Sequence, residues 1–597
     1  MSHHLALFSL LPLNAAAAKV VKAKENIGIA SILVVDGVRR HALDIGRTRT
    51  KLGDCGTLAT LGRCGDVVVD EPYISRIQCS FEVNPSSKIV MFCDRSPSQT
   101  CEVFGDEVFS LDRGQGFRGA RKVAVTRKIN TIIGMGGTGG DLIKFRLVWR
   151  TQKDDGDQTL QLQIESHLRF DAALDQTIDV WDPATTLSNL PLPRQSRIRL
   201  CSPEGDSALG AGTFGSVHKK INVDTGNLLA VKYIQVPQTR DRKFIEHLER
   251  EVRVLAKLTH PHIVKFLGYN HQLVPHEQVQ VMLELEDGTL QSLVERLVQS
   301  EDLEFGDGFL YLEDVVWETT LHHMLQALDF LASHKMIHRD VKPENILYTL
   351  RQPRSPFPSY KTQRPRPQDY HFRLGDLGLV NSQDYASTLA GTPLFMAPEM
   401  AQMFEKLQAG GRDRMQTPNM DVWSLFVSML WVADLYTNSE QWFQKKLQAA
   451  SRAGSHQVGR MVESLLPGNP ENKAKKHLLS PSIEDVFDMA WADPRRRASA
   501  AQILVYRFEG KGLTTPLEQV PELVRMPPPQ PPQPNPQAQA RWPQHVSVSG
   551  RSNNPGNSQG TDEMELTLQL GYLTVGQFPD KKLENLPNER ENLFRFR

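Results

Sequence analysis

The octapeptide HRDVKPEN, residues 338–345, brings an aspartate, a lysine and an asparagine close together in the chain. Asp340 offers a carboxylate that can accept a hydroxyl proton, Lys342 an ammonium that can neutralise a phosphoryl group, and Asn345 an amide oxygen that can bind a metal ion. Phosphoryl transfer depends mainly on positioning and charge neutralisation, so this set suits that chemistry. An HRD tripeptide arises by chance in long chains, whereas the complete octapeptide is much rarer.

Two further segments precede the octapeptide in the order that nucleotide binding requires. The run LGAGTFGSV, residues 209–217, is rich in glycine, and the absence of Cβ atoms lets backbone N–H groups close over phosphates. The run LAVK, residues 229–232, predicts an apolar strand that ends at Lys232, whose ammonium can bind a phosphate. An edge strand with a solvated lysine is the alternative interpretation of this second run.

Taken in order, these motifs resemble the eukaryotic-type protein kinase family over residues 197–508. The resemblance implies an α+β bilobal fold, ATP and Mg²⁺ as cofactors, and protein substrates. Lys342 is typical of the serine/threonine-directed members. The helical spacing of residues 243–258 places Glu251 where the family has the partner of Lys232, and Glu249 is its rival in register.

The resemblance also assigns roles to individual residues. In LGDLG, residues 374–378, Asp376 stands at the position of the family's principal metal ligand, with Leu377 in place of the usual phenylalanine. The implied catalytic residues are Asp340, Lys342, Asn345, Lys232, Glu251 and Asp376, of which Asn345 and Asp376 would bind Mg²⁺. The implied ATP-binding residues are Leu209, Gly210, Gly212, Gly215, Val217, Ala230, Lys232, Glu284 and Glu286.

An activation segment follows Asp376 and closes with GTP, residues 391–393, and APE, residues 397–399. We expect Thr392 to contact substrate near the catalytic loop, Arg497 to pair with Glu399, and Asp421 to open a buried helix that supports that loop. The alternative for Arg497 is a solvated arginine. The candidate regulatory phosphoacceptors, whose phosphate would pair with Arg339, are Ser382, Ser387 and Thr388, with Tyr385 beside them.

The first 150 residues predict a separate β-sandwich, because short apolar or alternating runs are divided by Gly, Pro, Asp and Asn. Within them LGR (61–63), VVVD (67–70), ISRIQ (74–78) and SF (80–81) resemble the forkhead-associated (FHA) domain. That resemblance implies that Arg63, Ser75 and Arg76 bind a phosphothreonine peptide, since arginine suits a dianionic phosphate. A solvated turn arginine and a turn-capping serine are the alternatives for Arg63 and Ser75.

The chain departs from the FHA pattern at two positions. Gln78 replaces the usual histidine, and we expect it to support the loop by hydrogen bonding. Gln99 stands near the position of an asparagine that contacts the peptide backbone, and it is one methylene longer. Phosphate recognition therefore depends on whether these two glutamines keep the loops in place.

An FHA-like domain ahead of a kinase is the arrangement of DNA-damage and meiotic checkpoint kinases, including those of fungi, and the order here is similar. The implied partners are protein substrates and a phosphothreonine on an adaptor or on a second copy of the chain, which would give a transient homodimer. One alternative is a phosphopeptide-dependent scaffold whose kinase fold has little or no activity. Another is a kinase whose sandwich docks proteins regardless of phosphate.

Composition indicates a multidomain intracellular protein, in the nucleus, the cytoplasm or both. The 597 residues suit three or four domains, and 69 basic residues balance 69 acidic ones, so no direct nucleic-acid partner is expected. We expect no membrane partner, because apolar runs are too short to span a bilayer. Residues 5–18 resemble a secretory leader, but no lysine or arginine precedes them and Pro12 interrupts them. The six cysteines lack zinc-site spacing, which favours free thiols.

The expected architecture is an FHA-like β-sandwich, then a bilobal kinase fold, then a largely disordered tail. The predicted boundaries are residues 1–150 for the sandwich, 151–195 for a linker, 196–512 for the kinase domain with an insertion at 349–370, 513–562 for a Pro-rich disordered linker, and 563–597 for a tail of unknown order.

Overall fold

The structure is a computed structural model of the whole chain. The chain divides into two compact units, Met1–Gln530 and Pro531–Arg597. The residues that it describes are 6–46, 56–111, 121–137, 142–150, 198–205, 207–212, 215–235, 252, 256–272, 278–299, 311–350, 365–376, 381–382, 392–408, 416–436, 442–453, 455–465 and 481–525. The second unit, the predicted linker at 151–195 and the predicted tail at 563–597 lie outside these ranges.

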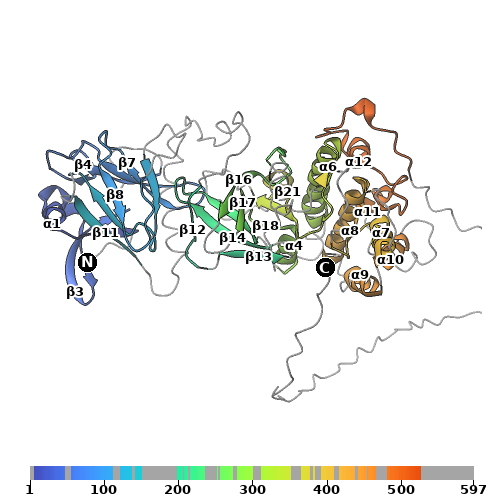
Figure 1. Cartoon of the computed structure of the whole chain (residues 1–597), viewed down its shortest axis with the longest axis horizontal. Helices are drawn as coiled ribbons and strands as arrows, with labels where there is room; N and C mark the ends of the chain where they lie inside the picture. The colour runs from blue at the N-terminus through green and yellow to red at the C-terminus, as the bar shows by residue number, and fades with distance from the viewer. Residues whose placement is uncertain are drawn as a thin grey trace, which may run out of the picture. The chain divides into compact units, whose positions relative to one another are not determined.

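The N-terminal region is a sandwich of two sheets, as the spacing of short apolar runs predicts (Figure 1). One sheet has the strand order β2-β3-β1-β11-β10-β8 and the other β5-β4-β6-β7-β9. The strands are β1 (Phe8–Pro12), β2 (Ala30–Val35), β3 (Val38–Ile45), β4 (Thr57–Gly62), β5 (Val67–Val68), β6 (Cys79–Val83), β7 (Val90–Asp94), β8 (Cys101–Phe104), β9 (Arg121–Val125), β10 (Ile132–Met135) and β11 (Ile143–Trp149).

The core of the sandwich joins these two sheets. Phe8 of β1 and Phe81 of β6 are fully buried, and their ring centroids lie 5.0 Å apart in an edge-to-face arrangement. Such aromatic pairs contribute about 0.5–1.5 kcal/mol beyond their buried area. Inward residues alternate with more exposed ones along β11, which is the pattern that a half-buried strand requires.

The leader-like segment near the N-terminus is part of this sandwich. β1 lies in the first sheet between β3 and β11, and its residues pair with both. Helix α1 (Ala15–Lys22) follows, and Asn14 caps it by accepting the Ala17 N–H at 3.0 Å. The sequence patterns did not predict this helix.

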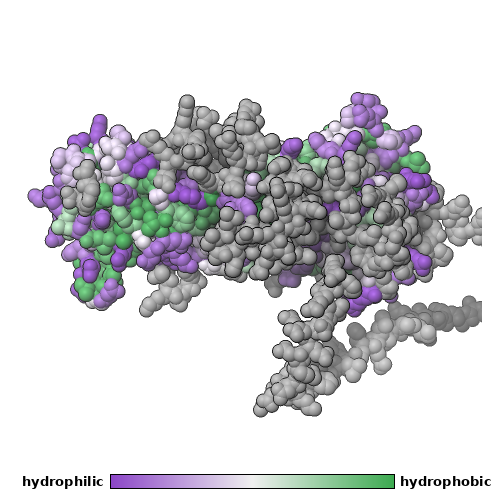
Figure 2. Space-filling view, viewed as in Figure 1, coloured by the Kyte–Doolittle hydropathy of each residue, from purple (hydrophilic) through white to green (hydrophobic). Residues whose placement is uncertain are grey.

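The hairpin of β2 and β3 carries apolar side chains on its outer surface. Ile32, Val34 and Val38 are respectively 44, 69 and 53% exposed, and Figure 2 shows green, apolar residues over this hairpin. The opposite face of β2 contributes Leu33 to a small cluster with Leu11 and Ala42. Both faces of β2 therefore carry apolar side chains.

The second described region, residues 198–525, begins with a six-stranded antiparallel sheet. Its strands are β12 (Leu200–Cys201), β13 (Ala208–Gly212), β14 (Gly215–Asn222), β15 (Leu228–Gln235), β16 (Phe266–Gln272) and β17 (Gln278–Glu284). The order is β12-β14-β15-β17-β16, with β13 paired to β14. This sheet is the small lobe of a bilobal fold.

The large lobe is mostly helical. Its elements are β18 (Gly288–Thr289), α4 (Leu290–Gln299), a π-helical turn (Leu312–Trp317), α6 (Glu318–Ser333), β19 (Met336–Ile337), β20 (Ile346–Leu350), a 3₁₀ turn (Pro367–Asp369), β21 (Tyr370–Leu374), β22 (Asn381–Ser382), α7 (Pro398–Gln408), α8 (Asn419–Tyr436), α9 (Trp442–Ala453), α10 (Ser455–Glu463), α11 (Pro481–Glu484) and α12 (Ala500–Phe508). Helix α8 is apolar on nearly all sides and buries Trp423 completely, as expected of a central helix.

Two predicted boundaries need correction. The insertion was expected at 349–370, yet Thr349 pairs with His371 and Leu350 with Tyr370, so these residues belong to strands β20 and β21. The Pro-rich linker was expected from residue 513, but residues 513–525 pack on the large lobe. Asp329 of α6 accepts the N–H groups of Thr514 and Thr515 at 2.7 and 3.0 Å, so this packing extends the folded region beyond 512.

Among the described residues, no helix combines the length and apolar character needed to cross a bilayer.

Candidate active site

The octapeptide at 338–345 forms the loop between β19 and β20, and hydrogen bonds to helix α8 support it. The Asp421 carboxylate accepts the His338 N–H at 2.7 Å and the Arg339 N–H at 2.8 Å, which confirms the predicted support. Burial raises the pKa of Asp421, although the nearby His338 ring and the two N–H groups oppose this effect. Arg339 itself has a left-handed backbone, with φ of 73°, so the two N–H bonds fix a strained turn.

Asp340 lies at the centre of a compact polar network. Its Oδ1 accepts the N–H and the hydroxyl of Thr392 at 2.9 and 2.7 Å. Its Oδ2 is 2.8 Å from the Lys342 ammonium and accepts an Asn345 N–H at 2.9 Å. Burial alone would raise the pKa of Asp340, but Lys342 and Thr392 outweigh it and hold the pKa below its ordinary value. Asp340 is therefore a carboxylate at neutral pH.

Lys232 and Asp376 meet although they are distant in sequence. The Lys232 ammonium lies 2.5 Å from Asp376 Oδ1, joining β15 of the small lobe to the end of β21. Asn345 Nδ2 donates to Asp340, which leaves its Oδ1 as the acceptor on the other side of the amide. Two oxygen donors, from Asn345 and Asp376, thus suit a hard divalent cation such as Mg²⁺.

Apart from two glutamates, the predicted nucleotide-binding residues lie along three adjacent strands. Leu209, Gly210 and Gly212 are in β13, Gly215 and Val217 in β14, and Ala230 and Lys232 in β15. Register places Val217 opposite Lys232. A Cβ at Gly215 would lie 1.9 Å from the Tyr233 carbonyl oxygen, so only glycine allows β14 to begin this close to β15.

The two predicted glutamates, Glu284 at the end of β17 and Glu286 just after it, have different surroundings. Glu286 has a side chain only 2% exposed, 2.6 Å from Arg373 Nη1 of β21, and it also accepts the Thr349 hydroxyl. Glu284 lies 3.3 Å from the same guanidinium. Burial raises the pKa of Glu286, against the influence of Thr349 and Arg373. The Glu286 carboxylate thus contacts β20 and β21, and the prediction that Glu284 and Glu286 bind ATP stays a prediction.

Sequence reasoning missed Arg373, which also donates from Nε to the Pro261 carbonyl at 3.1 Å. The only signal was a basic residue on the strand before Asp376, and that pattern does not reveal two acidic partners from another lobe. Glu251, Leu377, Ser387 and Thr388 lie outside the described residues. Ser382 lies in β22, where its backbone pairs with Met336.

A buried ion pair fixes the end of the activation segment. Arg497, whose side chain is fully buried, donates to the two Glu399 oxygens at 2.6 and 2.9 Å. It also donates to the carbonyls of Trp491, Ala492 and Asn419. The predicted pairing is confirmed, and the solvated alternative for Arg497 is wrong.

A second group of candidate residues lies on adjoining loops of the sandwich. Arg63 follows β4 and donates from Nε to the Ile74 carbonyl at 2.8 Å, while its backbone N–H donates to Ser75 O at 3.1 Å. Gly62 permits this approach, because a Cβ there would lie 2.5 Å from the Arg76 carbonyl oxygen. Arg63 and Arg76 are exposed, and Ser75 is half-buried between them.

Gln78 supports these loops from beneath. Its Oε1 accepts the Ser75 N–H at 2.9 Å, and its Nε2 donates to the Thr100 hydroxyl at 2.8 Å. This side chain therefore bonds the Ser75 loop to the loop before β8, which confirms the expected supporting role. Gln99 adopts a left-handed backbone, with φ of 54°, and its carbonyl accepts from Arg121 at 2.7 Å.

Comparison with known proteins assigns the bilobal region to a protein family. Residues 204–508 match the family described as "Protein kinase domain", which is just over half of the chain. The chain belongs to the protein kinase family. Such a domain implies the use of ATP and a divalent metal ion.

Several relatives are similar to this kinase over about half of its length. The MAP kinase kinase kinase wis4 of Schizosaccharomyces pombe is 30% identical over 300 residues, covering 50% of this chain and 18% of its own length. A probable serine/threonine-protein kinase of Dictyostelium discoideum is 29% identical, covering 50% and 49%. Human serine/threonine-protein kinase 10 is 28% identical, covering 50% and 26%. The kinase thus spans half or less of the length of these relatives.

Proposed function

We propose that this kinase transfers the γ-phosphoryl group of ATP, with Mg²⁺, to serine and threonine residues of proteins. The observation that carries the proposal is the network in which Asp340, Lys342 and Thr392 contact one another within 2.9 Å. Asp340 is ionised and stands where it can take the proton of an attacking hydroxyl. Lys342 places its positive charge beside the same carboxylate, where the transferred group would pass.

Cofactor binding divides between the two lobes. Lys232 would hold the α and β phosphates, and Asp376 with Asn345 would hold Mg²⁺. The metal ion would neutralise charge on the phosphates when bound. Serine and threonine specificity is supported by Lys342, whose ammonium donates to Thr392 at 2.7 Å and so links the catalytic loop to the segment that receives the substrate.

Lys232→Met tests the proposed transfer. We expect the variant to lose about 10²-fold or more in kcat with Mg-ATP, because a preorganised charge on the phosphates is removed. The measurement is incorporation of labelled phosphate into a generic Ser/Thr protein substrate and into the chain itself. Lys511→Met removes a 69%-exposed lysine and should leave the rate unchanged. Wild-type protein that phosphorylates neither substrate would overturn the proposal and favour a scaffold.

The sandwich is proposed to be an FHA-type module that recruits the kinase to phosphothreonine. Support comes from two exposed arginines, Arg63 and Arg76, on either side of Ser75, with both loops held by backbone and Gln78 bonds. The phosphothreonine would belong to an adaptor or to a second copy of the chain. In a transient homodimer, each kinase domain could phosphorylate Ser382, Ser387 or Thr388 of the other.

Arg63→Ala tests this module. Because a charge-assisted bond to phosphate contributes about 1.5–3 kcal/mol, we expect at least a tenfold loss of affinity for phosphothreonine peptides from a degenerate library. Fluorescence anisotropy with the full chain measures it. Arg39→Ala removes an exposed arginine of β3 and should have no effect. Equal binding of phosphorylated and unphosphorylated peptides would instead indicate a phosphate-independent docking domain.

The pathway proposal, checkpoint signalling in response to DNA damage or in meiosis, rests on the order of the two domains. A protein in such a pathway would be located in the nucleus, the cytoplasm or both. The printed names of several relatives place those proteins in MAP kinase cascades, but those matches cover only 50 to 53% of this chain. The sandwich is therefore what favours a checkpoint role over a place in such a cascade.

A further inference from the structure

Three histidines from separate segments come together in the large lobe, away from the active site. His262 precedes β16, His323 is in α6 and His371 is in β21. One ring nitrogen of each lies within 4.8 Å of the others. The ring centroid of His371 is 4.8 Å from that of His262 and 5.6 Å from that of His323. Imidazole is a common ligand of zinc-type transition metals.

Backbone carbonyls anchor two of the three rings. His262 Nδ1 lies 2.9 Å from the Phe372 carbonyl oxygen, and His371 Nε2 lies 2.8 Å from the Pro261 carbonyl oxygen. A neutral ring must donate N–H to each carbonyl, so the opposite nitrogen of each ring carries the lone pair. Metal-binding histidines usually have this same arrangement, because the carbonyl fixes both the tautomer and the ring orientation.

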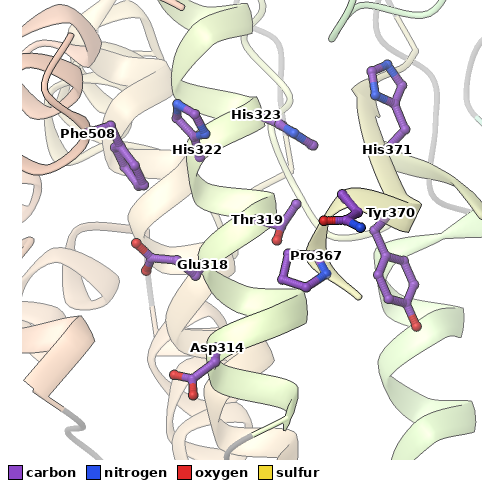
Figure 3. Close-up of a pocket in the computed structure, with 10 residues that line it drawn as sticks. Asp314, Glu318, Thr319, His322, His323, Pro367, Tyr370, His371 and Phe508 are labelled. Carbon is purple, nitrogen blue, oxygen red and sulfur yellow. The ribbon is translucent and has the colours of Figure 1, made fainter. Parts of the chain in front are cut away.

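A pocket of about 440 Å³ gives access to the cluster (Figure 3). His323 and His371 line it, together with Asp314, whose carboxylate would favour the entry of a cation. Figure 3 shows His323 extending from α6 on the side of β21, whereas His322 turns toward Phe508. His322 stacks on Phe508 with centroids 4.3 Å apart, and its Nε2 is 3.1 Å from the Lys511 carbonyl oxygen. His322 is therefore a matched neighbour outside the cluster.

One ring must turn before all three can bind a single ion. The rings of His262 and His323 are stacked, with centroids 3.9 Å apart and planes 19° from parallel. Lone pairs lie in the ring plane, so stacked rings cannot direct them at one point. His323 Nδ1 accepts the Phe372 N–H at 3.2 Å, and this bond would be exchanged for the metal bond. The terminal torsion of histidine is broad and permits such a rotation.

We propose that His262, His323 and His371 bind a zinc-type divalent ion, with a water molecule from the pocket as fourth ligand. The three nitrogen donors distinguish this site from the pair of oxygen donors, Asp376 and Asn345, that suits Mg²⁺. The bound ion would join α6, β21 and the segment before β16. Because β21 leads to Asp376, the ion would also stiffen one support of the active site. The proposal does not depend on the kinase activity.

Zn²⁺ titration of the full chain tests the site. The protein is stripped with a chelator and assayed by calorimetry without nucleotide or Mg²⁺. We expect wild type to bind one Zn²⁺ at this site, and His323→Asn or His371→Gln to weaken it by about 100-fold or more, since loss of an outer partner alone costs 10–100-fold. Glutamine at 371 can still donate to the Pro261 carbonyl. Substituting Co²⁺ should give the visible absorption of a tetrahedral ion in wild type.

His322→Asn is the control and should bind Zn²⁺ as wild type does. Zn²⁺ should also raise the midpoint of thermal unfolding of wild type and of His322→Asn, but not of the other two variants. The midpoints without metal show whether each variant is folded. Zn²⁺ binding that is unchanged in His323→Asn and His371→Gln, or that Mg²⁺ displaces at equal concentration, would overturn the proposal. Equal loss in His322→Asn would also overturn it, because the ion would then be at the mouth of the pocket.

Discussion

Asp340→Ala is expected to lower kcat by about 10²–10⁴-fold while the protein stays folded, because the group that accepts the substrate proton is removed. In the wild-type structure Asp340 accepts bonds from Thr392 and Asn345 and pairs with Lys342. The substitution leaves those donors around an empty position. Lys342 would then face the phosphoryl group without its carboxylate. Phosphate transfer at saturating Mg-ATP and protein substrate measures the loss.

Two controls separate chemistry from folding. Nucleotide affinity should change little in Asp340→Ala, since Lys232 and Asp376 remain paired. Asp369→Ala removes a half-buried carboxylate that accepts the Arg366 N–H in the turn before β21, and it should retain the wild-type rate. Transfer by Asp340→Ala at more than about a tenth of the wild-type rate would mean that another group takes the proton.

The catalytic loop was predictable from sequence because its chemistry is local. The residues that define it are close in the chain, and their order fixes Asp340, Lys342 and Asn345 relative to one another. Two other contacts join residues that are far apart in sequence: Arg497 pairs with Glu399, and Asp421 binds the catalytic loop. They were predictable only because the ordered motifs resembled a family in which those positions meet.

Contacts without a motif escaped prediction. Arg373 pairs with Glu286, which lies 87 positions earlier in the chain. No sequence pattern near either residue predicts this contact. The same holds for residues 513–525, whose composition suggested a continuation of the Pro-rich linker. Their N–H groups find a carboxylate on α6 that lies more than 180 positions earlier in the chain. Both cases depend on which distant segments meet, and that is a property of the folded chain.

The sandwich illustrates an intermediate case. Alternating apolar residues predicted its strands, and the chemistry of an amide predicted that Gln78 could support a loop. The second partner of Gln78, Thr100, lies 22 positions away and becomes evident only from the fold. The resemblance therefore pointed to Gln78, while the structure shows which two loops its side chain joins.

Arg497→Met is expected to lower the free energy of unfolding by about 3–5 kcal/mol, because it leaves the Glu399 carboxylate without its partner in a poorly solvated site. Arg497 is fully buried, and Glu399 is 16% exposed. The variant also removes the hydrogen bonds that the guanidinium donates to the carbonyls of Trp491, Ala492 and Asn419. Thermal and urea unfolding of the full chain measure the change.

Matched variants assign this loss to the buried pair. Arg495→Met removes an exposed arginine two positions earlier and should change stability by less than about 0.5 kcal/mol. Adding Glu399→Gln to Arg497→Met should recover part of the loss, because the unpaired charge is then removed while the stranded carbonyls remain. An Arg497→Met variant as stable as Arg495→Met would show that the pair contributes nothing. Since Glu399 closes the activation segment, the same variant should also lose activity at temperatures where it is still folded.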